Sequence, residues 1–131
     1  MSSVPTDREI IEGEIATYWF EDGILVSLSK SPKRTIENIT GNVALVKKIT
    51  GGKRAPLLIY LKNSPVPDKE TRRFAAEQLP NIYSAMAMVS KPGLAAFIMK
   101  ILFAMKPSPI PIKHFTDDTL ARQWLKQYVQ S

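Results

Sequence analysis

The segment whose residue types best suit binding chemistry follows an apolar run at residues 56–61 and a proline-rich loop, and it consists of Asp68, Lys69, Glu70, Thr71, Arg72 and Arg73. Asp68 is of a type that caps helices, because its carboxylate accepts hydrogen bonds from the free N–H groups two or three residues later. Lys69, Arg72 and Arg73 would crowd the first helical turn, where positive charge opposes the helix dipole. This placement suggests either that the positive charges bind an acidic partner or that they are simply tolerated at an exposed site.

The chain offers few groups for catalysis or metal binding. It has no cysteine and one histidine, His114, and it contains no Gly-x-Ser-x-Gly elbow and no glycine-rich phosphate loop. The pair Gly51-Gly52 follows an expected helix, so it is interpreted as a helix stop, and His114 as a surface or capping residue. We therefore expect no enzymatic activity, no metal site and no cofactor.

The charge of the chain is basic, with 18 Lys and Arg against 12 Asp and Glu and a formal net charge of +6. Such a field favours acidic partners without naming one. The basic residues are scattered along the sequence, without a recognition motif or interleaved aromatic residues. This pattern is typical of a solvated face and disfavours nucleic-acid binding.

The length of 131 residues suits one domain. We assign residues 1–13 to an N-terminal arm and residues 14–131 to a single domain. The N-terminus lacks the pattern of a secretory signal, and the longest apolar stretch, 94–105, is interrupted by Lys100. Because that stretch is shorter than the roughly 20 residues that span a bilayer, we expect a cytoplasmic protein.

Hydrophobic periodicity and turn signals predict the elements that position these groups. In chain order they are strands 15–20 and 24–28 joined by Asp22-Gly23, a helix capped by Thr35 and ended by Gly51, a central strand 56–61, a helix capped by Asp68 and ended by Pro80, a strand 82–89, a helix 94–105 and an edge strand near 110–115. The last element is a C-terminal helix opened by Thr116-Asp117-Asp118, on which Leu120, Trp124, Leu125 and Tyr128 share an apolar stripe. The order β-β-α-β-α-β-α-β-α implies an α/β domain: an N-terminal β-hairpin followed by a mixed, mostly parallel sheet with helices packed on it.

The expected helix 94–105 carries more apolar surface than a single contact with a sheet explains. The side chains in question are Phe97, Met99, Ile101, Phe103 and Met105. They could belong to the core, cover a protein interface such as that of a homodimer, line a site for an apolar ligand, or touch a membrane surface. The sequence leaves these alternatives open.

Three stretches carry a resemblance to a known family: LLIYLKNSPVPDKETRRFAAE, GLAAFIMKILFAMKPSPIPIKHF and FTDDTLARQWLKQY. Together with the order of elements, they resemble the SpoIIAA-like STAS domain of anti-sigma-factor antagonists. The more specific resemblance is to small bacterial proteins of the STAS/SEC14 type. The resemblance implies a SpoIIAA-like fold and a regulatory role in binding a protein partner.

In STAS antagonists the loop after the central strand ends in Asp-Ser-Ser/Thr-Gly, and a partner kinase phosphorylates the serine. Asp68 matches the aspartate, but Lys69, Glu70 and Thr71 occupy the next three positions, so the phosphorylatable serine is missing. Thr71 retains a hydroxyl on the first helical turn, where a phosphate would meet a favourable dipole, but we expect this threonine simply to face solvent. The sequence thus predicts a non-catalytic interaction module that uses the loop and helix start from Ser64 to Arg73. The alternative is a carrier or sensor of an apolar or lipid-like ligand beside the helix 94–105.

Overall fold

The computed structural model describes residues 5–30, 33–61, 67–91, 93 and 109–129. The elements are β1 (Ile11–Glu12), β2 (Ala16–Glu21), β3 (Ile24–Ser29), α1 (Ile36–Thr50), β4 (Ala55–Tyr60), α2 (Lys69–Ile82), β5 (Tyr83–Val89), β6 (Ile112–Phe115), α4 (Asp118–Leu125) and the 3₁₀ turn η2 (Lys126–Tyr128). The predicted helix 94–105 lies outside the described residues.

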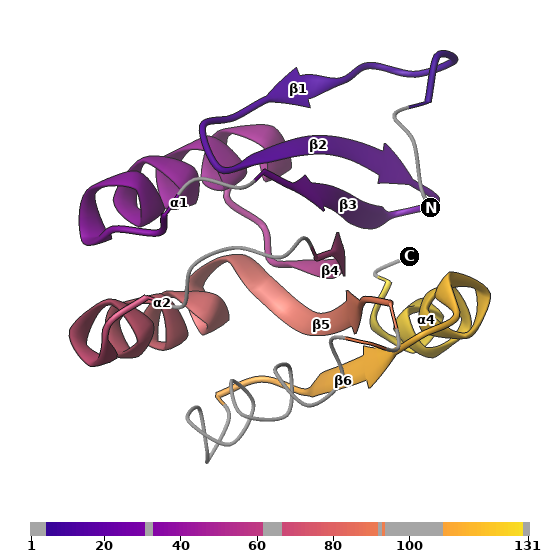
Figure 1. The fold of residues 1–131 in the computed structure, drawn as a ribbon. Helices are drawn as coiled ribbons and strands as arrows, with labels where there is room; N and C mark the ends of the chain where they lie inside the picture. The colour runs from indigo at the N-terminus through magenta and orange to yellow at the C-terminus, as the bar shows by residue number, and fades with distance from the viewer. Residues whose placement is uncertain (1–4, 31–32, 62–66, 92, 94–108, 130–131) are drawn as a thin grey trace.

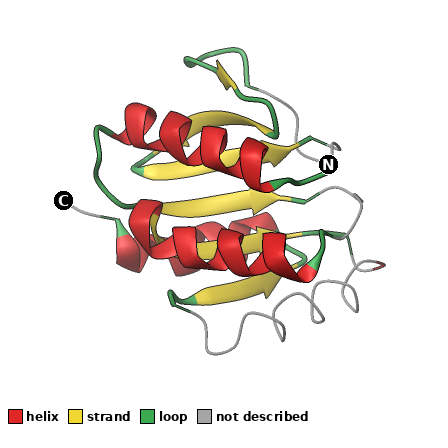
Figure 2. Ribbon diagram, turned by 90° about the vertical axis from the view of Figure 1, so that its left-hand side faces the viewer, coloured by secondary structure: helices red, strands yellow, loops and turns green. Residues whose placement is uncertain are grey.

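The strands form one six-stranded sheet in the order β1-β2-β3-β4-β5-β6. The first three strands pair antiparallel, whereas β3, β4, β5 and β6 pair parallel. Helices α1 and α2 lie side by side over one face of the sheet, and α4 covers the other face (Figures 1 and 2). The predicted mixed, mostly parallel α/β architecture is confirmed, with β6 at the edge where it was expected.

The turn between β2 and β3 is the two-residue hairpin that Asp22-Gly23 predicts. Glu21 pairs with Ile24, and both turn residues have positive φ, at 50° for Asp22 and 84° for Gly23. Such turns favour Asp-Gly because aspartate tolerates the left-handed region and glycine adopts it freely. Gly23 is also constrained by space, since a Cβ there would lie 2.6 Å from Cγ1 of Val129.

Strand β1 falls within residues 1–13, the expected N-terminal arm. Ile11 pairs with Tyr18, and the Gly13 N–H donates to the carbonyl of Ala16 at 2.8 Å. An ion pair between Lys30 and Glu12, at 2.8 Å, further ties this edge to the sheet. A strand of two residues is too short to show the alternation of apolar and polar residues from which strands are predicted, so the sequence gives no indication of β1.

Helix α1 begins and ends where its cap residues predict. The Thr35 hydroxyl accepts from the Asn38 N–H at 3.1 Å, and the Asn38 side chain accepts from the Thr35 N–H at 2.8 Å. These reciprocal bonds satisfy donors that a helix start leaves free. At the other end Gly51 adopts a φ of 67°, the left-handed conformation common after a last helical turn.

The prediction that Pro80 ends the second helix is wrong, because α2 continues to Ile82. Pro80 lacks the N–H for a helical hydrogen bond and its ring crowds the carbonyl four residues before it, so the last turn needs other support. The Tyr83 N–H still bonds the carbonyl of Leu79, which closes the last turn. Burial of Ile82 and Tyr83 holds that turn against the sheet.

The core has two layers, one on each face of the sheet. The layer under α1 and α2 contains Tyr18, Leu25, Val46, Leu57, Tyr83 and Met86 among others. The layer under α4 contains Trp19, Val26, Leu58, Ala85, Ala87, Ala121 and Leu125 among others. The central strands therefore bury both faces, as their nearly continuous apolar sequences predict.

The stripe predicted for the C-terminal helix is partly wrong. Leu125 is fully buried, but Leu120 is 53% exposed, and Ala121 takes the buried position one turn before Leu125. Because residues four apart share a helix face, Ala121 and Leu125 point to the sheet together, and Leu120 lies about 100° away from that face.

We predict that Leu125→Ala destabilises the protein by about 2–5 kcal/mol, because it removes a buried side chain and leaves a cavity. Leu120→Ala, the same change on the exposed side of the same helix, should alter the free energy of unfolding by less than about 0.5 kcal/mol. Urea unfolding of both variants checks this. Equal effects from the two substitutions would contradict the described position of α4.

Candidate functional site

The site predicted from the sequence lies at the start of α2, beyond the carboxyl end of β4. Asp68, Lys69, Glu70 and Arg73 are exposed, Arg72 is half-buried and Thr71 is buried. Ser64 lies outside the described residues, as do Phe97, Met99, Ile101, Phe103 and Met105. The structure therefore brings together the helix part of the predicted site.

Asp68 caps α2 as predicted. Its carboxylate Oδ1 accepts from the Thr71 N–H at 2.8 Å. Hydrogen bonds from the Thr71 backbone and hydroxyl hold the pKa of the Asp68 carboxyl below its ordinary value, and the nearby Lys33 and Arg72 add to the effect. The anion is thus stabilised where the helix presents free N–H groups.

The expectation that Thr71 faces solvent is wrong. Its side chain belongs to the buried set, with 6% exposed, and its hydroxyl is hydrogen-bonded to the Asp68 carboxylate. A phosphate at this position would meet that carboxylate, and like charges repel at such a distance. The hydroxyl therefore serves the cap, and its modification would require the first turn to open.

The positive side chains at this helix start make no close polar contact in the part of the chain that the structure describes, although Arg72 lies near enough to Asp68 to help lower its pKa. There Lys69, Arg72 and Arg73 form neither an ion pair nor a side-chain hydrogen bond. Their position opposes the helix dipole, and only Asp68 and Glu70 offset it locally. Such charges are available to an acidic group from outside the molecule.

His114 joins a second polar contact at the carboxyl edge of the sheet. Its Nε2 lies 2.6 Å from the Ser90 hydroxyl, and this contact links the ends of the neighbouring strands β5 and β6. Ser90 is 6% exposed. No pattern in the sequence connects Ser90 with His114, because the two residues become neighbours only through the parallel pairing of Met88 with His114.

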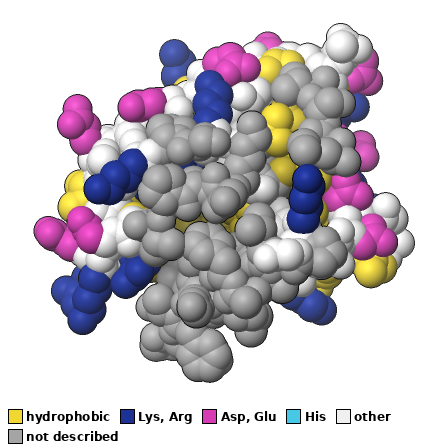
Figure 3. Space-filling view, viewed as in Figure 1, with side chains coloured by type: hydrophobic (Ala, Val, Ile, Leu, Met, Phe, Trp, Pro, Cys, Tyr) yellow, Lys and Arg dark blue, Asp and Glu magenta, His cyan; other side chains and the backbone are white. Residues whose placement is uncertain are grey.

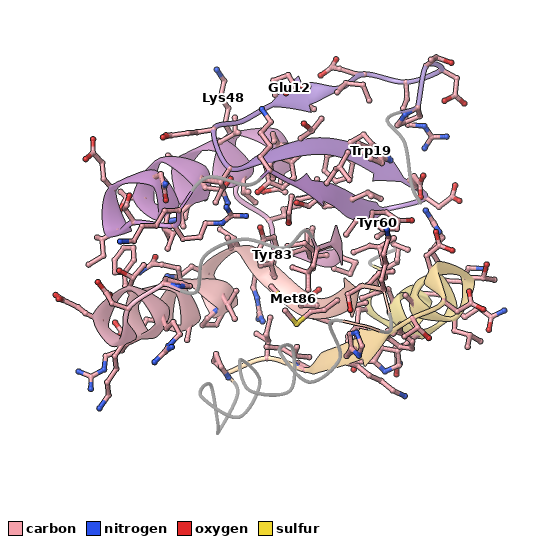
Figure 4. All side chains as sticks on the ribbon, in the orientation of Figure 1. Glu12, Trp19, Lys48, Tyr60, Tyr83 and Met86 are labelled. Atoms are coloured by element: carbon pink, nitrogen blue, oxygen red, sulfur yellow. The ribbon has the colours of Figure 1, made fainter. Side chains whose placement is uncertain are left out.

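A network around Arg122 fastens α4 to the opposite face of the sheet. Tyr60 donates to the Asp118 carboxylate at 2.7 Å and accepts from Arg122 at 2.9 Å. Arg122 also donates to Glu21 at 2.9 Å. Tyr60 lies on the side of the molecule where α4 packs (Figure 4). No local sequence pattern predicts these three hydrogen bonds, because the residues that each one joins lie 58 to 101 positions apart along the chain.

Among the described residues, no group of three or more His, Asp or Glu side chains could hold a metal ion. No helix in the same part of the chain has the length and apolarity to cross a membrane.

We predict that the Asp118 carboxylate makes the fold more sensitive to acid. The hydrogen bond from Tyr60, aided by Arg122, lowers the pKa of Asp118 from its ordinary value of 3.8. A lowered pKa stabilises the fold above about pH 4, and this contribution disappears as the pH falls through the folded-state value. The urea midpoint of the natural protein should therefore fall more between pH 7 and pH 3 than that of Asp118→Asn. Identical falls would contradict the role of this carboxylate.

We predict that Asp68→Ala lowers the melting temperature by a few degrees, because a helix cap is lost. Asp68→Asn should lower it less, since an asparagine side chain can also accept from the Thr71 N–H. Thermal melts followed by circular dichroism compare the two variants. A melting temperature unchanged in Asp68→Ala would remove Asp68 from this role.

Comparisons with known proteins place the chain in a structural group. A crystal structure of an uncharacterized protein from the DUF3478 family of Shewanella loihica PV-4, described as having a SpoIIAA-like fold, superposes with a TM-score of 0.55. It shares 18% sequence identity over 95% of this chain and 98% of the other. The predicted SpoIIAA-like, STAS-like fold is thereby confirmed. No protein in the curated comparison matches the sequence. The family model described as "Domain of unknown function (DUF7793)" matches residues 18–129, so the chain belongs to this family.

Proposed function

We propose that this protein is a non-catalytic regulatory module that binds an acidic surface of a protein partner through the start of α2. The observation that carries the proposal is the combination of a firmly capped first turn with three cations, Lys69, Arg72 and Arg73, which form no ion pair and no side-chain hydrogen bond with a described residue. A rigid turn presents these charges at low entropic cost. Complementary charge in a partner would speed association and fix its orientation.

The fold supports the same proposal. The STAS antagonists that the sequence resembles meet their partners at the corresponding loop and helix start. Here the serine position is occupied by another residue and the Thr71 hydroxyl is buried in the cap. We therefore propose that binding is constitutive and is not switched by phosphorylation at this turn.

The distribution of charge favours a local protein contact over a nucleic acid. On the face shown in Figure 3, Lys and Arg side chains are dispersed and alternate with Asp and Glu. Nucleic-acid sites instead gather cations in a stripe that follows the phosphates. A cytoplasmic location forms part of this proposal, as does the absence of a catalytic step.

The carrier alternative depends on the helix 94–105, which lies outside the described residues. No observation on the described residues favours it, and the same holds for a homodimer or a membrane contact through that helix. These alternatives stay predictions from the sequence.

We predict that the double substitution Arg72→Glu/Arg73→Glu weakens partner binding about tenfold or more, because two attractive charges become repulsive. The fold should persist, since acidic residues suit a helix start. Affinity capture from the source cells, read by quantitative mass spectrometry, identifies proteins lost by this variant. Titration with the purified candidate then gives the change in Kd.

The matched control is Lys47→Glu/Lys126→Glu, which changes the net charge equally at two exposed positions on other elements. It should retain the partner. Equal loss of binding in both variants would show that net charge alone matters and would overturn the assignment to α2.

A further inference from the structure

A groove lies at the amino ends of the parallel strands, at the end of the sheet opposite to the start of α2. It runs between the end of β2, the end of α1 and the beginning of β4. The pairing of Leu25 with Leu57 shows that this is the amino end of the parallel strands β3 and β4, whereas α2 follows the carboxyl end of β4. Any ligand of this groove would therefore be independent of the function proposed for α2.

The groove has an apolar wall. Its main hollow, of about 580 Å³, is lined by Ile11, Phe20, Leu45 and Ile49, with Arg8, Glu9 and Lys48 also contributing. A neighbouring hollow of about 200 Å³ shares Phe20 and Ile49. Phe20 is 38% exposed, one of three large apolar side chains recorded as exposed in the described part of the chain. Its ring offers unburied apolar area at the junction of the two hollows.

Cations outnumber anions among the residues that line the two hollows. Arg8, Lys48, Lys53 and Arg54 stand against Glu9. The Arg8 guanidinium donates to the carbonyl of Phe20 at 2.8 Å, which holds it beside the apolar wall, although Asp7 also contacts it. Lys48 and Lys53 form no ion pair with any described residue. Figure 4 shows Lys48 extending from α1 toward the β1 side of the molecule.

We propose that this groove binds a small amphipathic anion, an acyl chain or aromatic ring that carries a carboxylate or phosphate group. The apolar part would cover Phe20 and Ile49, and the charged group would meet Lys48, with Lys53 beside the smaller hollow. The volume of the main hollow lies within the range of about 300–1,000 Å³ typical of small-molecule sites. A largely apolar lining with a small number of polar or charged groups is also typical of such sites.

The direct test is a titration of the full chain followed by the backbone amide signals in nuclear magnetic resonance. Octanoate and octyl phosphate are the anionic probes, and octanol and octylamine match their chain length without the negative charge. We expect saturable shifts at Phe20, Lys48, Ile49 and Lys53 with the anions, weaker binding of octanol and the weakest of octylamine. The two anions distinguish a carboxylate from a phosphate ligand. Absence of saturable shifts, or equal binding of all four probes, overturns the proposal.

Two pairs of variants locate the interaction. Phe20→Ser should weaken binding of the anionic probe about three- to tenfold, because an aromatic contact is lost. Leu120→Ser removes a similarly exposed apolar side chain on α4 and should leave binding unchanged. Lys48→Glu should weaken binding about two- to fivefold more than Lys47→Glu, its neighbour on the same helix that does not line the groove. Equal effects within either pair contradict the assignment.

Discussion

The structure depends on one constraint, the burial of β3, β4 and β5 on both faces. Leu25, Leu58 and Ala87 are fully buried at the centre of these strands. A parallel sheet with two apolar faces needs a cover on each, and α1 and α2 supply one while α4 supplies the other. Because the parallel strands share a direction, α2 starts at their carboxyl edge, and the groove opens at their amino edge. The positions of both proposed sites follow from this arrangement.

Local signals in the sequence predicted the elements whose ends are set by single residues. Asp22-Gly23, Thr35, Gly51 and Asp68 each act within a few residues of the chain, through a turn conformation or a cap. The features that the sequence did not predict depend on burial and on pairing between residues that are far apart in the chain. Pro80 stays in α2 because the last turn is packed against the sheet, and Leu120 faces solvent because Ala121 and Leu125 take the buried positions. The network of Arg122 with Tyr60 and Glu21 joins parts of the chain that no local pattern connects.

The predicted binding site was recovered in part for the same reason. A capping aspartate can be recognised from its sequence neighbours, so the start of α2 was placed correctly. The burial of Thr71 depends on the packing of the first turn of α2 against the rest of the domain, which no local pattern reveals. Because it is buried, the Thr71 hydroxyl is part of the helix cap and is not an accessible group. The groove at Phe20 could not be predicted from the sequence, because its wall combines residues from β1, β2 and α1. The similarity to a SpoIIAA-like structure at 18% identity shows that a fold of this kind is shared by two quite different sequences.

The central claim is that the start of α2 is the surface that meets a partner protein. Hydrogen exchange followed by mass spectrometry, on the protein alone and in complex with its captured partner, measures this most directly. Peptides covering residues 68–76 should exchange more slowly in the complex, with little change in α4. Unchanged exchange at the start of α2, together with protection confined to another surface, would contradict it.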